Sequence, residues 1–308
     1  MKTEQPYRIK TINEYHQFRG LPKPEHPLIS VINYKLVVKK IRDDEPKSFV
    51  HDFYAIALKR GINARMKYGQ SEYDFDEGVM AFISPGQVFS IQAVNKDEAF
   101  SHSGWLLLVH PDFLWNTPLA KTINQHDYFN YAVHEALHLS EKEELTMACI
   151  VQNIEQEYHA NIDKFSQNII ITHLESLFSY AERFYHRQFI TRQINNHQIV
   201  NQLESILDDC FDDDKVAKNG LPTVQYVADK LNVSPNYLSG LLNILTGQST
   251  QQHIHDKVIK KAKEKLSITN KSVSEIAYEL GFEHPQSFSK LFRNKTNFSP
   301  LEFRQSFT

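Results

Sequence analysis

The segment PQSFSKLFRNKT, residues 285–296, combines an apolar stripe with a face of groups that suit an anionic partner. Phe288, Leu291 and Phe292 follow the i, i+3, i+4 spacing of a buried helix face. The other positions carry amide, hydroxyl and cationic groups: Gln286, Ser287, Ser289, Lys290 and Arg293. The segment contains no acidic residue, although a solvated helix face usually balances Glu against Lys. A partner with readable hydrogen-bonding edges is therefore favoured, and a merely solvated face is the alternative for one helix taken alone.

The same pattern occurs fifty residues earlier in the chain. LSGLLNILTGQS, residues 238–249, aligns with FSKLFRNKTNFS, residues 288–299, at its apolar positions. Before each copy lies a shorter helical pattern, VQYVADKLNV or VSEIAYELGF, which ends near a residue that tolerates a left-handed turn, Asn232 or Gly281. A proline then begins the following helix. This order predicts two helix-turn-helix motifs.

Residues 250–266, TQQHIHDKVIKKAKEKL, predict the helix that connects the two motifs. Its apolar positions form one stripe, and five lysines surround it: Lys257, Lys260, Lys261, Lys263 and Lys265. A helix of about 17 residues is roughly 25 Å long, and the major groove of B-DNA repeats about every 34 Å. Such a rod can hold two recognition helices near successive major grooves on one face of DNA.

The charge of the chain is divided unevenly. The net charge is −3, but from Thr223 onward 11 Lys and Arg stand against 7 Asp and Glu, a net +4, which leaves −7 for the first 222 residues. The C-terminal part is therefore the part suited to a polyanion.

Length and composition favour a soluble protein of two domains. The chain has 308 residues, of which 41% are hydrophobic and 23% charged. No apolar run approaches the ~20 residues of a membrane span, and the first residues lack the apolar core of a signal peptide. We therefore expect a cytoplasmic protein with no membrane partner. The two cysteines, Cys149 and Cys210, are too few and too far apart for a disulfide framework or a cysteine zinc site.

The N-terminal part predicts short strands followed by helices. FYAIALKR, GVMAFIS, QVFSIQAV and GWLLLVH are bounded by Gly, Pro, Asn and Asp, as expected for a barrel or sandwich. A helical pattern runs from about Glu141 to Arg187, and the Asn- and Gln-rich stretch that follows is typical of a linker. The predicted division is a domain at 1–187, a linker at 188–198 and a second domain at 199–308.

Residues 223–307 resemble the DNA-binding domain of AraC/XylS-type transcription regulators, above all through SVSEIAYELGFEHPQSFSKLFRNKTNFSPLEFRQ. DEGVMAFISPGQVFSI resembles the cupin-like sensor domain of that family more loosely. The resemblance implies an α+β fold: a cupin-like β-barrel followed by helices, and a C-terminal all-α domain with two helix-turn-helix motifs. It implies a homodimer that regulates transcription by binding double-stranded promoter DNA, with RNA polymerase as a further partner if the protein is an activator.

In that family the second helix of each motif enters a major groove. The resemblance therefore implies base contacts for Gln286, Ser287 and Lys290, with Arg293 and Lys295 nearer to the phosphates. The corresponding face of the first motif carries four polar side chains: Asn236, Tyr237, Ser239 and Asn243. Gly240 and Asn243 stand where the family often has basic residues. We therefore expect the first motif to contribute shape and phosphate positioning more than base readout.

The N-terminal domain raises the question of sensing against catalysis. Four residues beside the first strands are candidates for binding a small-molecule effector, with ordinary exposed strand residues as the alternative: His51, Tyr54, Arg65 and Tyr68. The identity of the effector cannot be predicted from the sequence.

Metal chemistry is the rival interpretation. No H-x-H precedes GVMAFISPGQ, as it would in enzymatic cupins. HEALH, residues 134–138, spells a zinc-protease motif, but Ser140 and Glu143 begin a new helix directly after it. We therefore predict no metal, no cofactor and no enzymatic activity. The alternative is a metal-dependent cupin enzyme fused to a DNA-binding domain.

Overall fold

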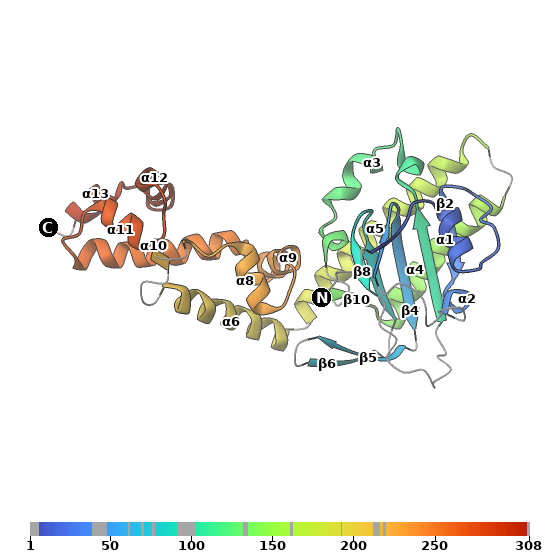
Figure 1. Ribbon diagram of the computed structural model, residues 1–308, viewed down its shortest axis with the longest axis horizontal. Coiled ribbons are helices and arrows are strands. Elements are labelled where there is room, and N and C mark those ends of the chain that lie inside the picture. Colours follow the sequence, from blue (N-terminus) through green and yellow to red (C-terminus); the bar gives the residue numbers. More distant parts are fainter. Residues whose placement is uncertain are drawn as a thin grey trace. The chain divides into compact units, whose positions relative to one another are not determined.

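The structure is a computed structural model that describes residues 6–38, 48–60, 62–68, 71–75, 78–90, 103–131, 135–160, 163–191, 193–211, 216–217 and 220–306. The chain divides into two compact units, Met1–Gln188 and Phe189–Thr308 (Figure 1). The sheets lie in the first unit, whereas the second contains only helices among its described elements. The expected α+β class is therefore confirmed.

A five-stranded antiparallel sheet forms the larger layer of the first unit. Its strands, in spatial order, are β10 (Leu137–His138), β7 (Val79–Ile83), β4 (Tyr54–Arg60), β9 (Ser103–Val109) and β2 (Ile29–Asn33). In the centre of the sheet, Ile56 of β4 lies opposite Phe82 on one side and Leu107 on the other. All three are buried, because a central strand of this sheet is covered on both faces.

A smaller sheet faces the larger one across a shared core. It consists of β1 (Tyr7–Ile9), β3 (Ser48–His51) and β8 (Val88–Ser90), and β1 pairs with β3 in parallel. Ile9 and Phe49 from this sheet belong to the same buried cluster as Ala57 and Leu108 from the larger sheet. The short strands predicted from the sequence thus form two facing sheets. A separate hairpin pairs β5 (Ile62–Tyr68) with β6 (Ser71–Phe75).

Two long helices complete the first unit, α4 (Glu141–His159) and α5 (Ser166–Thr191). α4 begins with the expected capping box, in which Ser140 and Glu143 bond to each other's backbone N–H groups. The shorter helical segments are α1 (Ile12–Phe18), α2 (Tyr34–Val38), η1 (Pro111–Leu114), α3 (Leu119–Thr122), η2 (Ile123–Gln125) and η3 (Asp127–Asn130). No helix in the described ranges combines the length and apolarity that crossing a bilayer would require.

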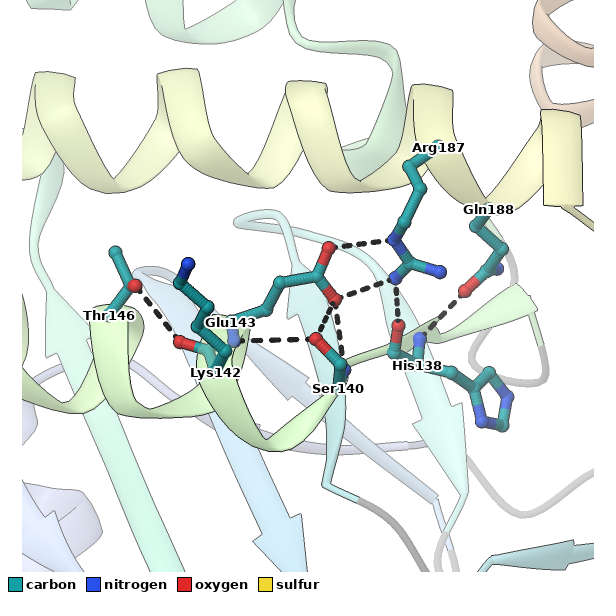
Figure 2. A network of polar contacts seen from close by, with 7 residues as sticks. All are labelled: His138, Ser140, Lys142, Glu143, Thr146, Arg187 and Gln188. Carbon is teal, nitrogen blue, oxygen red and sulfur yellow. Dashed lines mark hydrogen bonds and ion pairs between the residues drawn. The ribbon is translucent and has the colours of Figure 1, made fainter.

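A network of polar contacts joins α5 to the start of α4 (Figure 2). Arg187 donates to the carboxylate of Glu143 at 2.7 Å and to the carbonyl oxygen of His138 at 2.7 Å. Gln188 accepts from the backbone N–H of His138 at 2.7 Å and donates to the carbonyl oxygen of Ala136 at 3.2 Å. Side chains of α5 thereby satisfy backbone groups of the segment that contains β10.

The second unit contains seven helices among the described residues: α6 (Gln193–Phe211), α8 (Val224–Leu231), α9 (Pro235–Thr246), α10 (Thr250–Ile268), α11 (Val273–Glu279), α12 (Pro285–Thr296) and α13 (Pro300–Gln305). The linker predicted at 188–198 is largely helical, because α5 continues to Thr191 and α6 begins at Gln193. Asn and Gln lower helix stability by only roughly 0.7 kcal/mol or less per residue, so a stretch rich in them can stay helical. The assignment of separate functions to residues 1–187 and 199–308 remains a prediction.

Candidate nucleic-acid interface

The first motif consists of α8, a left-handed turn and α9. Thr223 caps α8 by accepting from the backbone N–H of Tyr226, and α8 ends at Asn232, whose φ is 54° and ψ 43°. Asn adopts this conformation more readily than most residues with a Cβ atom. Ser234 then caps α9, with Pro235 at its first position. The predicted start and stop signals therefore operate where the sequence placed them.

The second motif repeats this order in α11 and α12, with Gly281 at the turn. Ser272 and Glu275 form a capping box at α11, and Gly281 adopts a φ of 81°. A Cβ atom on Gly281 would lie 2.5 Å from Cγ1 of Val216 and 2.9 Å from the Val216 carbonyl oxygen. Glycine is required here both for its backbone conformation and for the close approach of residue 216.

Each second helix is anchored by a buried apolar stripe. Leu238, Leu241 and Leu242 of α9 are fully buried, and so are Phe288 and Phe292 of α12. The two phenylalanines belong to a cluster with Ile276 and Ala277 of α11 and with residues of α10. Because these stripes face inward, the helix positions opposite them are turned toward solvent.

On α12 the predicted base-contact residues are open to solvent. Gln286, Ser287 and Lys290 are exposed, as is Arg293. Neither Lys290 nor Arg293 forms an ion pair with a carboxylate in the part of the chain that the structure describes. Their charges are therefore available to a partner. Lys295 differs, because its Nζ lies 2.8 Å from Oδ1 of Asp256 on α10.

On α9 the four candidates are divided between exposed and engaged side chains. Asn243 is exposed and Asn236 is half-buried. The ring of Tyr237 packs edge-on against Phe189 with centroids 5.0 Å apart, and the hydroxyl of Ser239 lies 3.1 Å from Oγ1 of the buried Thr250. Tyr237 and Ser239 therefore take part in internal packing and bonding.

The lysines of the connecting helix are largely matched by acids. Lys257 pairs with Asp208, Lys261 with Glu264 at 4.0 Å, and Lys265 with Glu279 at 2.8 Å. The hydrogen bond from Lys257 lowers the pKa of Asp208, and those from Lys265 and Lys271 lower the pKa of Glu279. Both carboxyls thus stay ionised. The connecting helix consequently offers less free positive charge than its sequence indicates.

Sequence reasoning did not single out Asp256. Its Oδ2 also accepts a hydrogen bond of 3.0 Å from Nε2 of Gln248, in the turn after α9. It is one of only two acids in the lysine-rich stretch 250–266, and this was the one signal that could have marked it.

The effector candidates lie in separate surroundings. His51 is buried and stacks on Phe53 at 4.7 Å, and burial, followed by the charge of Arg19, lowers the pKa of His51 to about 4. Tyr54 donates to Oδ1 of Asn124 at 3.1 Å. Ala55 and Ala57 belong to the core shared with the smaller sheet. The alternation of side chains along a strand therefore places Tyr54 on the opposite face of β4. Arg65 and Tyr68 lie on β5, with side chains outside the described residues.

The described part of HEALH, residues 135–138, is not the α-helix that a zinc-protease motif requires. Leu137–His138 form β10 and pair with β7, while the carbonyl oxygen of Glu135 accepts from the hydroxyl of Tyr185. His134 lies outside the described residues. No group of three metal-binding side chains occurs within the described ranges.

A family model described as a helix-turn-helix domain matches residues 227–306. The transcriptional activator RhaS of Enterobacter sp. (strain 638) is 26% identical over 270 residues, which cover 83% of this chain and 86% of that protein. An uncharacterised HTH-type transcriptional regulator of Pseudoalteromonas carrageenovora is 30% identical over 116 residues, 38% of this chain and 64% of that relative. The solved C-terminal domain of AraT, a response regulator from Geobacillus stearothermophilus, is 29% identical over 35% of this chain and 84% of that one, with a TM-score of 0.31.

The matches and the geometry agree on the C-terminal unit. The matched residues contain both motifs from α8 to α13 almost entirely, and the RhaS match extends into the first unit. Residues 227–306 therefore form a helix-turn-helix domain, and the chain is similar to AraC/XylS-type transcription regulators over this domain and part of the first unit.

Proposed function

We propose that this protein regulates transcription by binding specific sequences in double-stranded promoter DNA through its C-terminal unit. The observation that carries the proposal is the exposed face of α12. It places amide, hydroxyl and cationic groups on a helix whose opposite face is fixed by the fully buried Phe288 and Phe292. Such a helix can enter a major groove without losing its own packing.

Roles for the α12 residues follow from their chemistry. The amide of Gln286 suits the N6 and N7 edge of adenine, and the ammonium of Lys290 suits O6 and N7 of guanine. Ser287 is a permissive contact, and Arg293 lies one turn further along, where a phosphate contact fixes the register. In the first motif Asn236 and Asn243 remain as the candidates, because Tyr237 and Ser239 have internal contacts.

The first unit would control how two copies of the C-terminal unit engage DNA. Helices α4 and α5 are the proposed dimerisation elements, and exposed apolar side chains on them, Leu145, Ile169 and Tyr180, offer a surface for a second copy. An effector bound in the first unit would shift the population of DNA-competent dimers. RNA polymerase becomes a partner if the protein is an activator, as the name of the RhaS relative suggests for that protein. We place the protein in the cytoplasm and assign it no catalytic role.

Selection of sheared genomic DNA by the purified full-length protein, followed by sequencing, tests the proposal. We expect a motif with two preferred blocks about one helical turn, ~10 bp, apart. Retention of fragments that share no motif would contradict sequence-specific regulation and would favour non-specific bridging of DNA. Failure to retain DNA even at low salt, with and without extracts that could supply an effector, would contradict DNA binding.

A further inference from the structure

One carboxylate joins the ends of both recognition helices. Asp256 lies in the first half of α10, the helix that connects the motifs. Its Oδ2 accepts from Nε2 of Gln248, in the turn directly after α9, at 3.0 Å. Its Oδ1 accepts from Nζ of Lys295, in the last turn of α12, at 2.8 Å. Groups 47 residues apart in sequence are thus held by one side chain.

The position of these contacts matters more than their strength. The side chain of Asp256 is 43% exposed and that of Lys295 is 30% exposed, so solvent screens the pair and its contribution to folding is small. Gln248, however, directly follows α9, and Lys295 lies in the last turn of α12. Both helices are expected to enter a major groove. A tie between these two points opposes changes in the spacing and the relative rotation of α9 and α12.

The same contact neutralises a cation in the last turn of α12. Lys290 and Arg293 have no carboxylate partner among the described residues, whereas Lys295 on the same helix is neutralised by Asp256. A phosphate oxygen would have to displace the carboxylate to bind Lys295. Asp256 therefore competes with any phosphate for Lys295.

We propose that Asp256 is a positioning residue that sets the spacing of the two recognition helices and keeps Lys295 from non-specific phosphate contacts. The inference rests on the proposed function, because it concerns how the two motifs share one DNA site. With Asp256 intact, the protein binds well only where the two half-sites have the matching separation. Without the carboxylate, α9 and α12 adapt to other separations, and Lys295 adds a contact that any DNA can supply.

Asp208→Asn provides a matched control for Asp256→Asn. Asp208 pairs with Lys257 of α10, so its substitution also releases one lysine. It leaves the contacts of Asp256 with Gln248 and Lys295 in place. The comparison separates the gain of a free cation from the loss of the tie. Lys295→Met approaches the same contact from its other end and releases no cation.

The experiment measures the affinity of full-length wild type and the three variants for the genomically selected site, for versions with one base pair added or removed between the half-sites, and for a random duplex. Titrations by fluorescence anisotropy at several salt concentrations give the salt slope. We expect wild type to lose tenfold or more for either spacing change, and Asp256→Asn to lose less than threefold. Asp256→Asn should also bind the random duplex more tightly, with a log–log salt slope steeper by about 0.9.

The controls decide the interpretation. Lys295→Met should relax the spacing preference without steepening the slope, and Asp208→Asn should keep the wild-type spacing preference. The inference is overturned if Asp256→Asn keeps the wild-type spacing penalty and salt slope, or if Asp208→Asn relaxes the spacing equally. Wild type that prefers no site over random DNA would instead refute the proposed function itself. Circular dichroism of each variant identifies any misfolded sample, and Lys295→Met then remains as the second test of the tie.

Discussion

The two helix-turn-helix motifs share a framework and differ on their surfaces. Both second helices bury most of their apolar stripe, through Leu238 and Leu242 in α9 and through Phe288 and Phe292 in α12, whereas Leu291 of α12 is partly buried. On the outer face α12 presents Lys290 and Arg293, whereas α9 carries no cation. Positions that hold the fold are therefore matched between the copies, while positions that meet a partner have diverged. We infer that the second motif carries most of the base readout.

The turns of the two motifs also differ in how closely other residues pack against them. Asn232 in the first turn leaves its side chain exposed, but Gly281 in the second lies against Val216 and the backbone of Gly220. The segment before α8 thus contacts the second motif at its turn. The second motif is accordingly the more constrained of the two.

Gly281→Ala should have the largest effect. It adds a Cβ atom where φ is 81° and where Val216 would lie 2.5 Å away, so we expect a loss of roughly 2–4 kcal/mol in the stability of the second motif. Asn232→Gly, at the matching turn, should change stability by less than about 1 kcal/mol. Hydrogen exchange of the amides of α8 and α11 in the full chain measures both values. Equal, small effects would show that the turns are equivalent.

Arg293→Ala tests the phosphate role. Loss of one phosphate contact should weaken binding to all sequences alike, by roughly tenfold or about 1.4 kcal/mol, and should reduce the log–log salt slope by about 0.9. Asn243→Ala, one turn from the end of α9, should leave the slope unchanged because no charge is lost. A sequence-dependent loss in Arg293→Ala would mean that this side chain reads bases.

Ser239→Ala should act on folding. The substitution leaves the buried hydroxyl of Thr250 without this partner, which costs about 1 kcal/mol of stability. Ser289→Ala, the matching position in α12, should cost less because no hydrogen bond of the Ser289 side chain occurs among the described residues. Chemical unfolding of both variants, beside their base preferences, checks the assignment. A changed base preference in Ser239→Ala would restore a readout role to this residue.

The smallest expected effect is on the pH dependence of stability at the end of the first motif. His253 Nε2 lies 2.9 Å from Oγ1 of Thr246, and burial lowers the pKa of His253. Because the unfolded chain then binds the proton more readily, the contribution of His253 should be complete above pH 6.5 and should fall as pH drops through its lowered pKa. His253→Gln should flatten this dependence in hydrogen exchange of α9. An unchanged dependence would assign it to another group, such as His255.

Local signals in the sequence predicted the motifs well. The cap at Ser140, the prolines at the starts of α9 and α12, and the turns at Asn232 and Gly281 depend on neighbouring residues, and all occur as expected. Such signals fix φ, ψ and nearby hydrogen bonds, which the type of residue largely determines.

Long-range contacts could not be predicted in this way. The partner of Lys295 lies 39 residues away, and that of Ser239 lies on the next helix. Tyr54 lies on the face of β4 turned away from the smaller sheet, and only the packing of the two sheets decides which face that is. The stretch 188–198 is helical where it is described, because polar composition alone does not end a helix. Each of these outcomes is decided by tertiary packing, for which one sequence gives no local sign.

Selection from a random-sequence DNA library tests the asymmetry of the motifs most directly. Base preferences would be compared among wild type, the double variant Gln286→Ala with Lys290→Ala, and the matched double variant Asn236→Ala with Asn243→Ala. We predict that the α12 variant loses preference at two separate bases, at roughly 1–3 kcal/mol each, and that the α9 variant keeps the wild-type preferences with weaker overall binding. Loss of base preference in the α9 variant, with wild-type preferences in the α12 variant, would contradict the account.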